Sequence, residues 1–304
     1  MPMFGAAVET FLDRVIDHWD DLYSLPSFEK LCDRLYALYH DESEQVVPAK
    51  SDDEFNKCMR GLIQLHAQTG GRVELNKHGY HEFYTNYEKA AENLDAEKEP
   101  YRVYVNASTK NVIVLGRILV KLVCIDATAM YFKIANDAAG VDQRKDAIVI
   151  YTFGRNEAEA IAKRLGQITG DKLTPSVPGM TREVAKGISV AADPKWNGKD
   201  SVSFGQHRVR PFATAIICYR DQFALANKLD SVDADTHTEV FRILLAGAFR
   251  AHKINALDPS SNAPASAAKI SKEADLQAGK ITVPVMDVKA AKYFLSLASK
   301  GALG

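Results

Sequence analysis

The sequence predicts an α+β fold, in which a central mixed β-sheet with packed helices follows an N-terminal helical layer. Three observations indicate this. The 304 residues are 46% hydrophobic and 25% charged, which is typical of a globular protein. Apolar residues recur at helical spacing in the first hundred residues, whereas strand-like and helix-like segments alternate after Pro100. We expect a helical layer over residues 1–98 and an α+β body over residues 99–304, packed as one unit.

The N-terminal layer is predicted to contain four helices. An amphipathic face runs over residues 8–23 and ends at Pro26, and a second helix follows over residues 28–38. A capping box at residues 51–54 opens the third helix, and a shorter helix is expected over residues 83–94. The apolar positions of the first helix are Val8, Phe11, Leu12, Val15, Ile16, Trp19, Leu22 and Tyr23.

The body begins with an alternating strand over residues 101–106, followed by a helix over residues 109–123. Strands are expected over residues 129–134 and 146–153, the second one buried because it is apolar on both faces. A helix over residues 156–168 comes next. This order predicts a sheet with helices packed on it.

The elements of the remaining third of the chain are predicted from short sequence patterns. We expect a strand over residues 184–191 and helices over residues 203–228 and 238–252. A polar loop is expected over residues 258–268, and a last helix over residues 288–297.

Charge and cysteine usage exclude several classes of protein. The 38 Lys and Arg residues nearly balance 39 Asp and Glu residues, which disfavours a broad basic surface for nucleic acid. The four cysteines are widely spaced and are expected to be free thiols in a reducing compartment: Cys32, Cys58, Cys124 and Cys218. The start of the chain lacks a secretory-signal pattern, and the most apolar run, residues 112–125, is too short to span a bilayer. We therefore expect a soluble, cytoplasmic protein that binds neither nucleic acid nor membrane.

Standard motifs for nucleotide binding, metalloprotease chemistry and calcium binding are absent from the sequence. His78 and His81 are three residues apart, but they lie in a polar turn without a third ligand in view. We expect no metal and no cofactor.

Basic residues occupy unusual positions in the predicted strands. Arg102 and Lys133 lie within otherwise apolar strands, and Arg144 and Lys145 directly precede the buried strand. Each has an ordinary explanation: Lys133 can face solvent from the polar side of the sheet, and Arg144 and Lys145 can form a solvated turn. Tyr104, likewise, is either an amphipathic sheet residue or a catalytic acid.

Three further basic residues lie in the first turns of the helix that Ser203 opens: His207, Arg208 and Arg210. A helix N-terminus carries positive partial charge and disfavours cations, so these side chains need an anion. A phosphate would gain both backbone N–H groups and guanidinium contacts, although an internal ion pair would also hold the arginines.

Three segments resemble the HopA-class type III effector family: SFGQHRVR at residues 203–210, YFKI at 131–134, and RKDAIVIYT at 144–152. The resemblance extends over residues 101–219. Relatives of this family occur beside kinase-like proteins in clusters that make dehydrated, lanthipeptide-type peptides. There they are taken to eliminate phosphate from phosphoserine or phosphothreonine.

The resemblance also implies roles for individual residues. The order of Arg102, Tyr104, Lys133 and Arg144 is similar to that of the phosphothreonine lyase effectors, with Lys133 at the position of the base. Those lyases have histidine where this chain has Tyr104, so His207 competes for the role of the acid. The residues implied to bind phosphate are Arg102, Arg144, Lys145, Arg208 and Arg210.

Two functions from different classes follow. The first is a metal-independent lyase, for which burial and nearby cations must keep Lys133 neutral. The second is a non-catalytic, effector-like module that binds a phosphopeptide or a protein partner through the same basic cleft, either in the cytoplasm or after secretion into a host cell. A kinase-like protein or a chaperone is a further expected partner, docking on apolar residues of the helical front: Trp19, Leu22, Tyr23 and Phe28.

Overall fold

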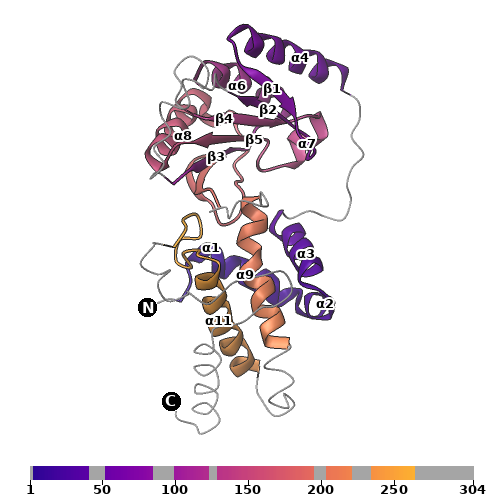
Figure 1. Cartoon of the computed structure of the whole chain (residues 1–304), viewed down its shortest axis with the longest axis vertical. Coiled ribbons are helices and arrows are strands. Elements are labelled where there is room, and N and C mark those ends of the chain that lie inside the picture. The colour runs from indigo at the N-terminus through magenta and orange to yellow at the C-terminus, as the bar shows by residue number, and fades with distance from the viewer. Residues whose placement is uncertain are drawn as a thin grey trace. The chain divides into compact units, whose positions relative to one another are not determined.

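The computed structural model describes residues 3–40, 52–84, 99–122, 129–194, 203–220 and 234–263. The chain divides into two compact units (Figure 1). One combines Met1–Asp41 with Pro194–Gly304, and the other is Glu42–Asp193. The expected boundary at residue 98 falls inside the second of these.

The unit Glu42–Asp193 is built on a seven-stranded sheet with the order β1-β2-β4-β5-β3-β7-β6. Its strands are β1 (Arg72–Leu75), β2 (Tyr80–Tyr84), β3 (Tyr101–Val105), β4 (Tyr131–Ala135), β5 (Ile148–Thr152), β6 (Arg182–Ala185) and β7 (Ile188–Ala192). The α+β class is confirmed. All pairings of these strands are antiparallel, which corrects the mixed pairing that was expected. The reason is that β5 inserts between β3 and β4, which run in the same direction, and so gives a split β-α-β arrangement.

Helices cover one face of this sheet. They are α4 (Asp53–Gln68), α6 (Thr109–Val120), α7 (Ala138–Gln143) and α8 (Arg155–Thr169), with the short 3₁₀ helix η2 (Gly170–Lys172) after α8 (Figure 1). The sheet residues of this face include one register row that crosses five strands: Phe83, Phe132, Ile150, Val103 and Val190. This row belongs to the same buried core as the apolar residues of α4, α6 and α8. Burial of this face is the main contribution to the stability of the unit.

Two hairpins were not expected. Arg72–Leu75 and Tyr80–Tyr84 pair as β1 and β2, where a helical layer was predicted through residue 98. Their turn is closed by the Asn76 side chain, whose Oδ1 accepts from the Tyr80 N–H at 3.1 Å, and by Gly79 at φ 77°. The second hairpin joins β6 to β7 through Gly187 at φ 70°, so the single strand expected over residues 184–191 is two strands. The helix expected over residues 83–94 starts inside β2, and its remainder lies outside the described residues.

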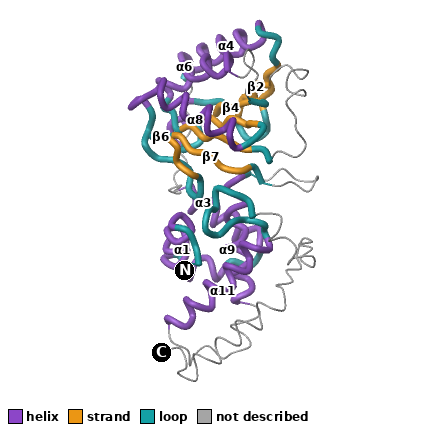
Figure 2. The backbone as a smooth tube through the Cα atoms, turned by 90° about the vertical axis from the view of Figure 1, so that its left-hand side faces the viewer, coloured by secondary structure: helices purple, strands orange, loops and turns teal. Residues whose placement is uncertain are grey.

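The other unit is helical in its described part. It contains α1 (Ala6–Asp17), α2 (Trp19–Ser24), α3 (Phe28–His40), α9 (Phe204–Cys218) and α11 (Ala234–Ala251) (Figures 1 and 2). The helix expected over residues 8–23 is divided at His18 into α1 and α2. Aromatic side chains form its core: Phe11 and Phe249 both contact Phe212 edge-on, at ring-centroid distances of 4.9 and 5.6 Å.

Capping residues define where two helices begin. Asp52 caps α4 by accepting from the Phe55 N–H at 2.9 Å, so Asp52 and not Ser51 is the first capping residue. Ser203 and Gln206 form a capping box at the start of α9. The helix expected over residues 288–297 and the end of the one expected over residues 203–228 lie outside the described residues. In the described segments, we find no helix with the length and apolar character to cross a membrane.

Candidate functional site

The face of the sheet opposite the helices carries tyrosines and charged residues in two register rows. The first row is Tyr84, Tyr131, Tyr151, Arg102 and Ala191. The second row is Glu82, Lys133, Val149, Tyr104 and Ser189. Since alternate residues of a strand point to the same face, the sheet places three predicted site residues, Arg102, Tyr104 and Lys133, on one surface.

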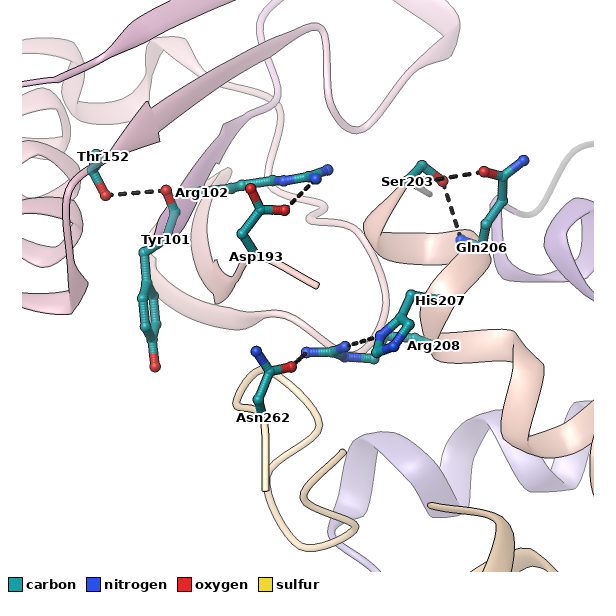
Figure 3. A network of polar contacts seen from close by, with 9 residues as sticks. All are labelled: Tyr101, Arg102, Thr152, Asp193, Ser203, Gln206, His207, Arg208 and Asn262. Atoms are coloured by element: carbon teal, nitrogen blue, oxygen red, sulfur yellow. Dashed lines mark hydrogen bonds and ion pairs between the residues drawn. The ribbon is translucent and has the colours of Figure 1, made fainter. Parts of the chain in front are cut away.

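The first row is a stack of rings that ends at a guanidinium. Tyr84 and Tyr131 stack at a centroid distance of 5.0 Å, and Tyr131 and Tyr151 at 4.1 Å. The Arg102 Cζ lies 4.9 Å from the centroid of Tyr151. Arg102 also forms an ion pair with Asp193, directly after β7 (Figure 3). The stack and the ion pair together fix the position of the guanidinium.

Lys133 contacts aromatic rings. Its Nζ lies 4.3 Å from the centroid of Tyr80 and 5.9 Å from that of Tyr151. We find no carboxylate within ion-pair distance of this ammonium in the parts of the chain that the structure describes. Lys133 is half-buried and lies next to Tyr151, the ring that also carries Arg102.

Arg144 reaches the same cluster from the turn before β5. Its Cζ lies 4.8 Å from the centroid of Tyr80, and its Nε donates to Asp146 Oδ1 at 3.2 Å. The Tyr80 hydroxyl donates to the same Asp146 oxygen at 3.4 Å. Lys145, the next residue of this turn, is half-buried. Tyr80 therefore connects Lys133 to Arg144, as Tyr151 connects Lys133 to Arg102.

Tyr104 lies beside this cluster and is buried. Burial raises the pKa of Tyr104; Tyr151, Asp193 and Asp146 raise it further, and the Arg102 guanidinium opposes them. The phenol is therefore protonated throughout the physiological pH range. A protonated hydroxyl on this face is a proton donor.

The sequence did not identify Tyr80, Tyr151, Asp146 or Asp193 as site residues. Tyrosines in strands are common, and the registers between strands decide which of them share a face. One signal was available: Asp146 follows Arg144 at a spacing of two, and a carboxylate at that distance can pair with it.

The predicted residues of α9 lie in the other unit and form a separate cluster. Arg208 is fully buried, and its Nε donates to the Pro259 carbonyl at 2.7 Å. Its Nη2 donates to Asn262 Oδ1 at 3.0 Å, and its Nη1 lies 2.5 Å from His207 Nδ1 (Figure 3). These contacts attach the segment 259–262 to α9. The buried guanidinium is thus balanced by polar groups of its own unit.

Arg210, two residues further along α9, is half-buried. Burial lowers the pKa of His252 to about 4, and the charge of Arg210 lowers it as well. His252 is held by a hydrogen bond of 3.0 Å between its Nε2 and Thr214 Oγ1. His207, Arg208 and Arg210 are thus brought together in one unit, and the five other predicted site residues in the other.

The apolar residues expected to form a docking stripe are mostly covered within their own unit. Leu22 is buried, and Trp19, Tyr23 and Phe28 are half-buried. Trp19 packs edge-on against Phe241 at a centroid distance of 5.0 Å. The described residues contain no cluster of three or more side chains suited to holding a metal ion.

Two solved structures of effector proteins are similar to this chain. One is from Pseudomonas syringae pv. tomato strain DC3000, with a TM-score of 0.58 and 15% sequence identity, over 85% of this chain and 99% of that one. The other is from Pseudomonas syringae pv. syringae strain 61, with a TM-score of 0.54 and 14% identity, over 85% of this chain and 97% of that one. At these identities the likeness establishes the fold.

Comparison with curated proteins finds no match. A family profile described as the HopA1 effector protein family matches residues 76–260. This match covers more than half of the chain. It includes the sheet face that carries Arg102, Tyr104 and Lys133, and it includes the start of α9. The chain therefore belongs to the HopA1 effector protein family.

Proposed function

We propose that this protein is a metal-independent lyase, which eliminates phosphate from phosphoserine or phosphothreonine in a peptide or protein and leaves a dehydroamino acid. One observation carries the proposal: Lys133 lies against two tyrosine rings, Tyr80 and Tyr151, and each of these rings also carries an arginine. A candidate base and two candidate phosphate ligands thus meet on one face of the sheet.

In the proposed reaction the neutral amine of Lys133 removes the Cα proton of the phosphorylated residue. The electron pair of that C–H bond forms the Cα–Cβ double bond, and the Cβ–O bond breaks as phosphate leaves. Arg102 and Arg144 stabilise the negative charge on the departing phosphate. Tyr104 is proposed to donate the proton that neutralises it. Lys133 then loses its proton to water and the Tyr104 phenolate takes one from water, which returns both groups to their starting forms.

We assign the phosphate to the sheet face and not to Arg208. The guanidinium of Arg208 is buried and donates to Pro259 and Asn262, so an anion would have to displace the segment that contains both. Lys145 is half-buried and remains a candidate contact to the substrate. Arg210 belongs to the other unit and is not assigned to this site.

A second function is favoured by the rings around Lys133. The face of a tyrosine ring attracts a cation, and a lysine ammonium binds phosphate but cannot act as a base. The second candidate is therefore a non-catalytic, effector-like module that holds a phosphopeptide or a phosphorylated protein on the same face. Membership of an effector family supports action inside a host cell for either function.

Mass spectrometry of phosphothreonine and phosphoserine peptides incubated with the protein in EDTA tests the proposal. Loss of phosphoric acid, leaving a dehydrated residue, is expected from the wild type. Lys133→Ala should abolish it, whereas Lys163→Ala, exposed on α8, should not. Loss of the phosphoryl group alone would identify a phosphatase and overturn the lyase. Unchanged peptides that are retained on the immobilised protein would support the binding module instead.

A further inference from the structure

The face that carries the three candidate ligands also carries carboxylates. Asp146 Oδ1 accepts from Arg144 Nε at 3.2 Å and from the Tyr80 hydroxyl at 3.4 Å. Asp193 pairs with Arg102 at the other end of the cluster. Both carboxylates raise the pKa of Tyr104, after the larger effect of its burial, so both lie within electrostatic reach of the same phenol. The Asp146 and Asp193 side chains keep 15% and 24% of their surface exposed, so neither side chain is fully buried.

These carboxylates change what the site can bind. An anion that approaches Arg102 and Arg144 also approaches Asp146 and Asp193. A carboxylate repels an anion that has no hydrogen, but it accepts a hydrogen bond from an anion that bears one. Inorganic phosphate keeps at least one hydrogen at neutral pH, whereas sulfate keeps none. A phosphomonoester bears a hydrogen in its monoanionic form, below its second pKa of about 6.

We propose that Asp146 and Asp193 are specificity-determining residues, which make the site accept a hydrogen-bearing phosphate and reject sulfate and sulfate esters. The ligand class is the phosphomonoester monoanion and the hydrogen phosphate released from it. This inference rests on the proposed phosphate site between Arg102 and Arg144, and it holds for a lyase and for a binding module alike.

The remaining charged and titratable groups around Asp146 come from its own turn and from neighbouring strands. They are Arg144 and Lys145 in the turn, Tyr80 and Glu82 on β2, Lys133 on β4 and Tyr104 on β3. Glu82 lies opposite Lys133 in the register and accepts from the Tyr84 hydroxyl at 2.5 Å and from the Asn76 amide at 2.7 Å. Its oxygens therefore accept from β2 and its turn, whereas Asp146 and Asp193 contact the two arginines directly.

Calorimetric titration of the full chain with inorganic phosphate and with sulfate, at equal ionic strength and neutral pH, tests the inference. The wild type is expected to bind phosphate about tenfold or more tightly than sulfate. Asp146→Asn keeps an oxygen for Arg144 Nε but removes the negative charge. It is expected to bind sulfate more tightly and to reduce the preference to about threefold or less. Asp142→Asn, exposed on α7, is the matched control and should keep the wild-type preference.

Asp193→Asn is the second variant, and thermal unfolding establishes that each variant is folded. If the wild type binds phosphate without a preference over sulfate, the inference is wrong and the phosphate site stands. The same holds if the preference for phosphate survives in both Asp146→Asn and Asp193→Asn. If the wild type binds neither ion, the phosphate site fails and the inference fails with it.

Discussion

The Nζ of Lys133 lies 4.3 Å from the centroid of the Tyr80 ring, and the Cζ of Arg144 lies 4.8 Å from the same centroid. The two cations come from different parts of the chain, and Tyr80 on β2 is the residue they share. The ring attracts both cations, whereas the two positive charges repel each other. The position of the Lys133 ammonium therefore depends on how Tyr80 and Arg144 are held.

Replacing Lys133 with arginine separates catalysis from binding. A guanidinium stays protonated in proteins, so Lys133→Arg keeps a cation beside Tyr80 and Tyr151 but cannot remove a proton. We expect elimination to fall by about 10²–10⁴-fold, while phosphopeptide affinity stays within about threefold of the wild type. Single-turnover mass spectrometry and fluorescence anisotropy measure the two quantities. Lys163→Arg is the control, and elimination at the wild-type rate by Lys133→Arg would show that Lys133 is not the base.

Tyr80 should act through its ring more than through its hydroxyl. Tyr80→Phe keeps the ring beneath Lys133 and Arg144 and loses the hydroxyl that donates to Asp146 at 3.4 Å, so we expect kcat within about threefold of the wild type. Tyr80→Leu removes the ring from both cations and should lower kcat/KM by about tenfold. Steady-state rates measure kcat and KM separately. A wild-type kcat/KM in Tyr80→Leu would contradict a role in positioning Lys133.

Arg208 should stabilise the folded state of its unit. Arg208→Met removes the donors to Pro259 and Asn262 and leaves buried acceptors without them, so we expect the free energy of unfolding to fall by about 2–4 kcal/mol. Arg210→Met, on the half-buried side of α9, should cost less than about 1 kcal/mol. Urea unfolding measures both, and hydrogen exchange over residues 255–262 locates the effect. If Arg208→Met were as stable as the wild type, the segment 259–262 would be held by other contacts.

Local patterns were sufficient to predict most of the helices and the inner strands. The alternation over residues 101–106 and the apolar run over residues 146–153 correspond to β3 and β5, because each carries its own periodicity. Strands β1 and β2 were missed for a physical reason. β1 has four residues that are mostly exposed, so it has no apolar alternation, and β2 is identified only by its pairing with β1 and β4.

The site could be predicted only in part, because a face of a sheet is defined by the registers between its strands. The cations Arg102, Lys133 and Arg144 are conspicuous in the sequence, and their positions suggested a shared role. The rings that join them lie on strands far apart in the sequence. The sequence also gave no sign that the Arg208 guanidinium would be enclosed by residues 259–262, since that contact spans 51 residues of the chain.

Acidification should weaken the unit that contains His252. Burial lowers its pKa in the folded protein to about 4, with a further contribution from Arg210, whereas an unfolded histidine titrates near 6.5. Between these two values the unfolded chain binds a proton that the folded one excludes, so stability present above about pH 6.5 is lost as the pH falls to about 4. We expect a loss of about 2–3 kcal/mol over this window. His252→Gln can keep the hydrogen bond to Thr214, and it should reduce this pH-dependent loss of the free energy of unfolding. Urea unfolding at one pH above and one pH below the window measures the loss. Burial also lowers the pKa of His66 in the other unit, so part of the pH dependence should remain. An unchanged slope in His252→Gln would contradict the assignment to His252.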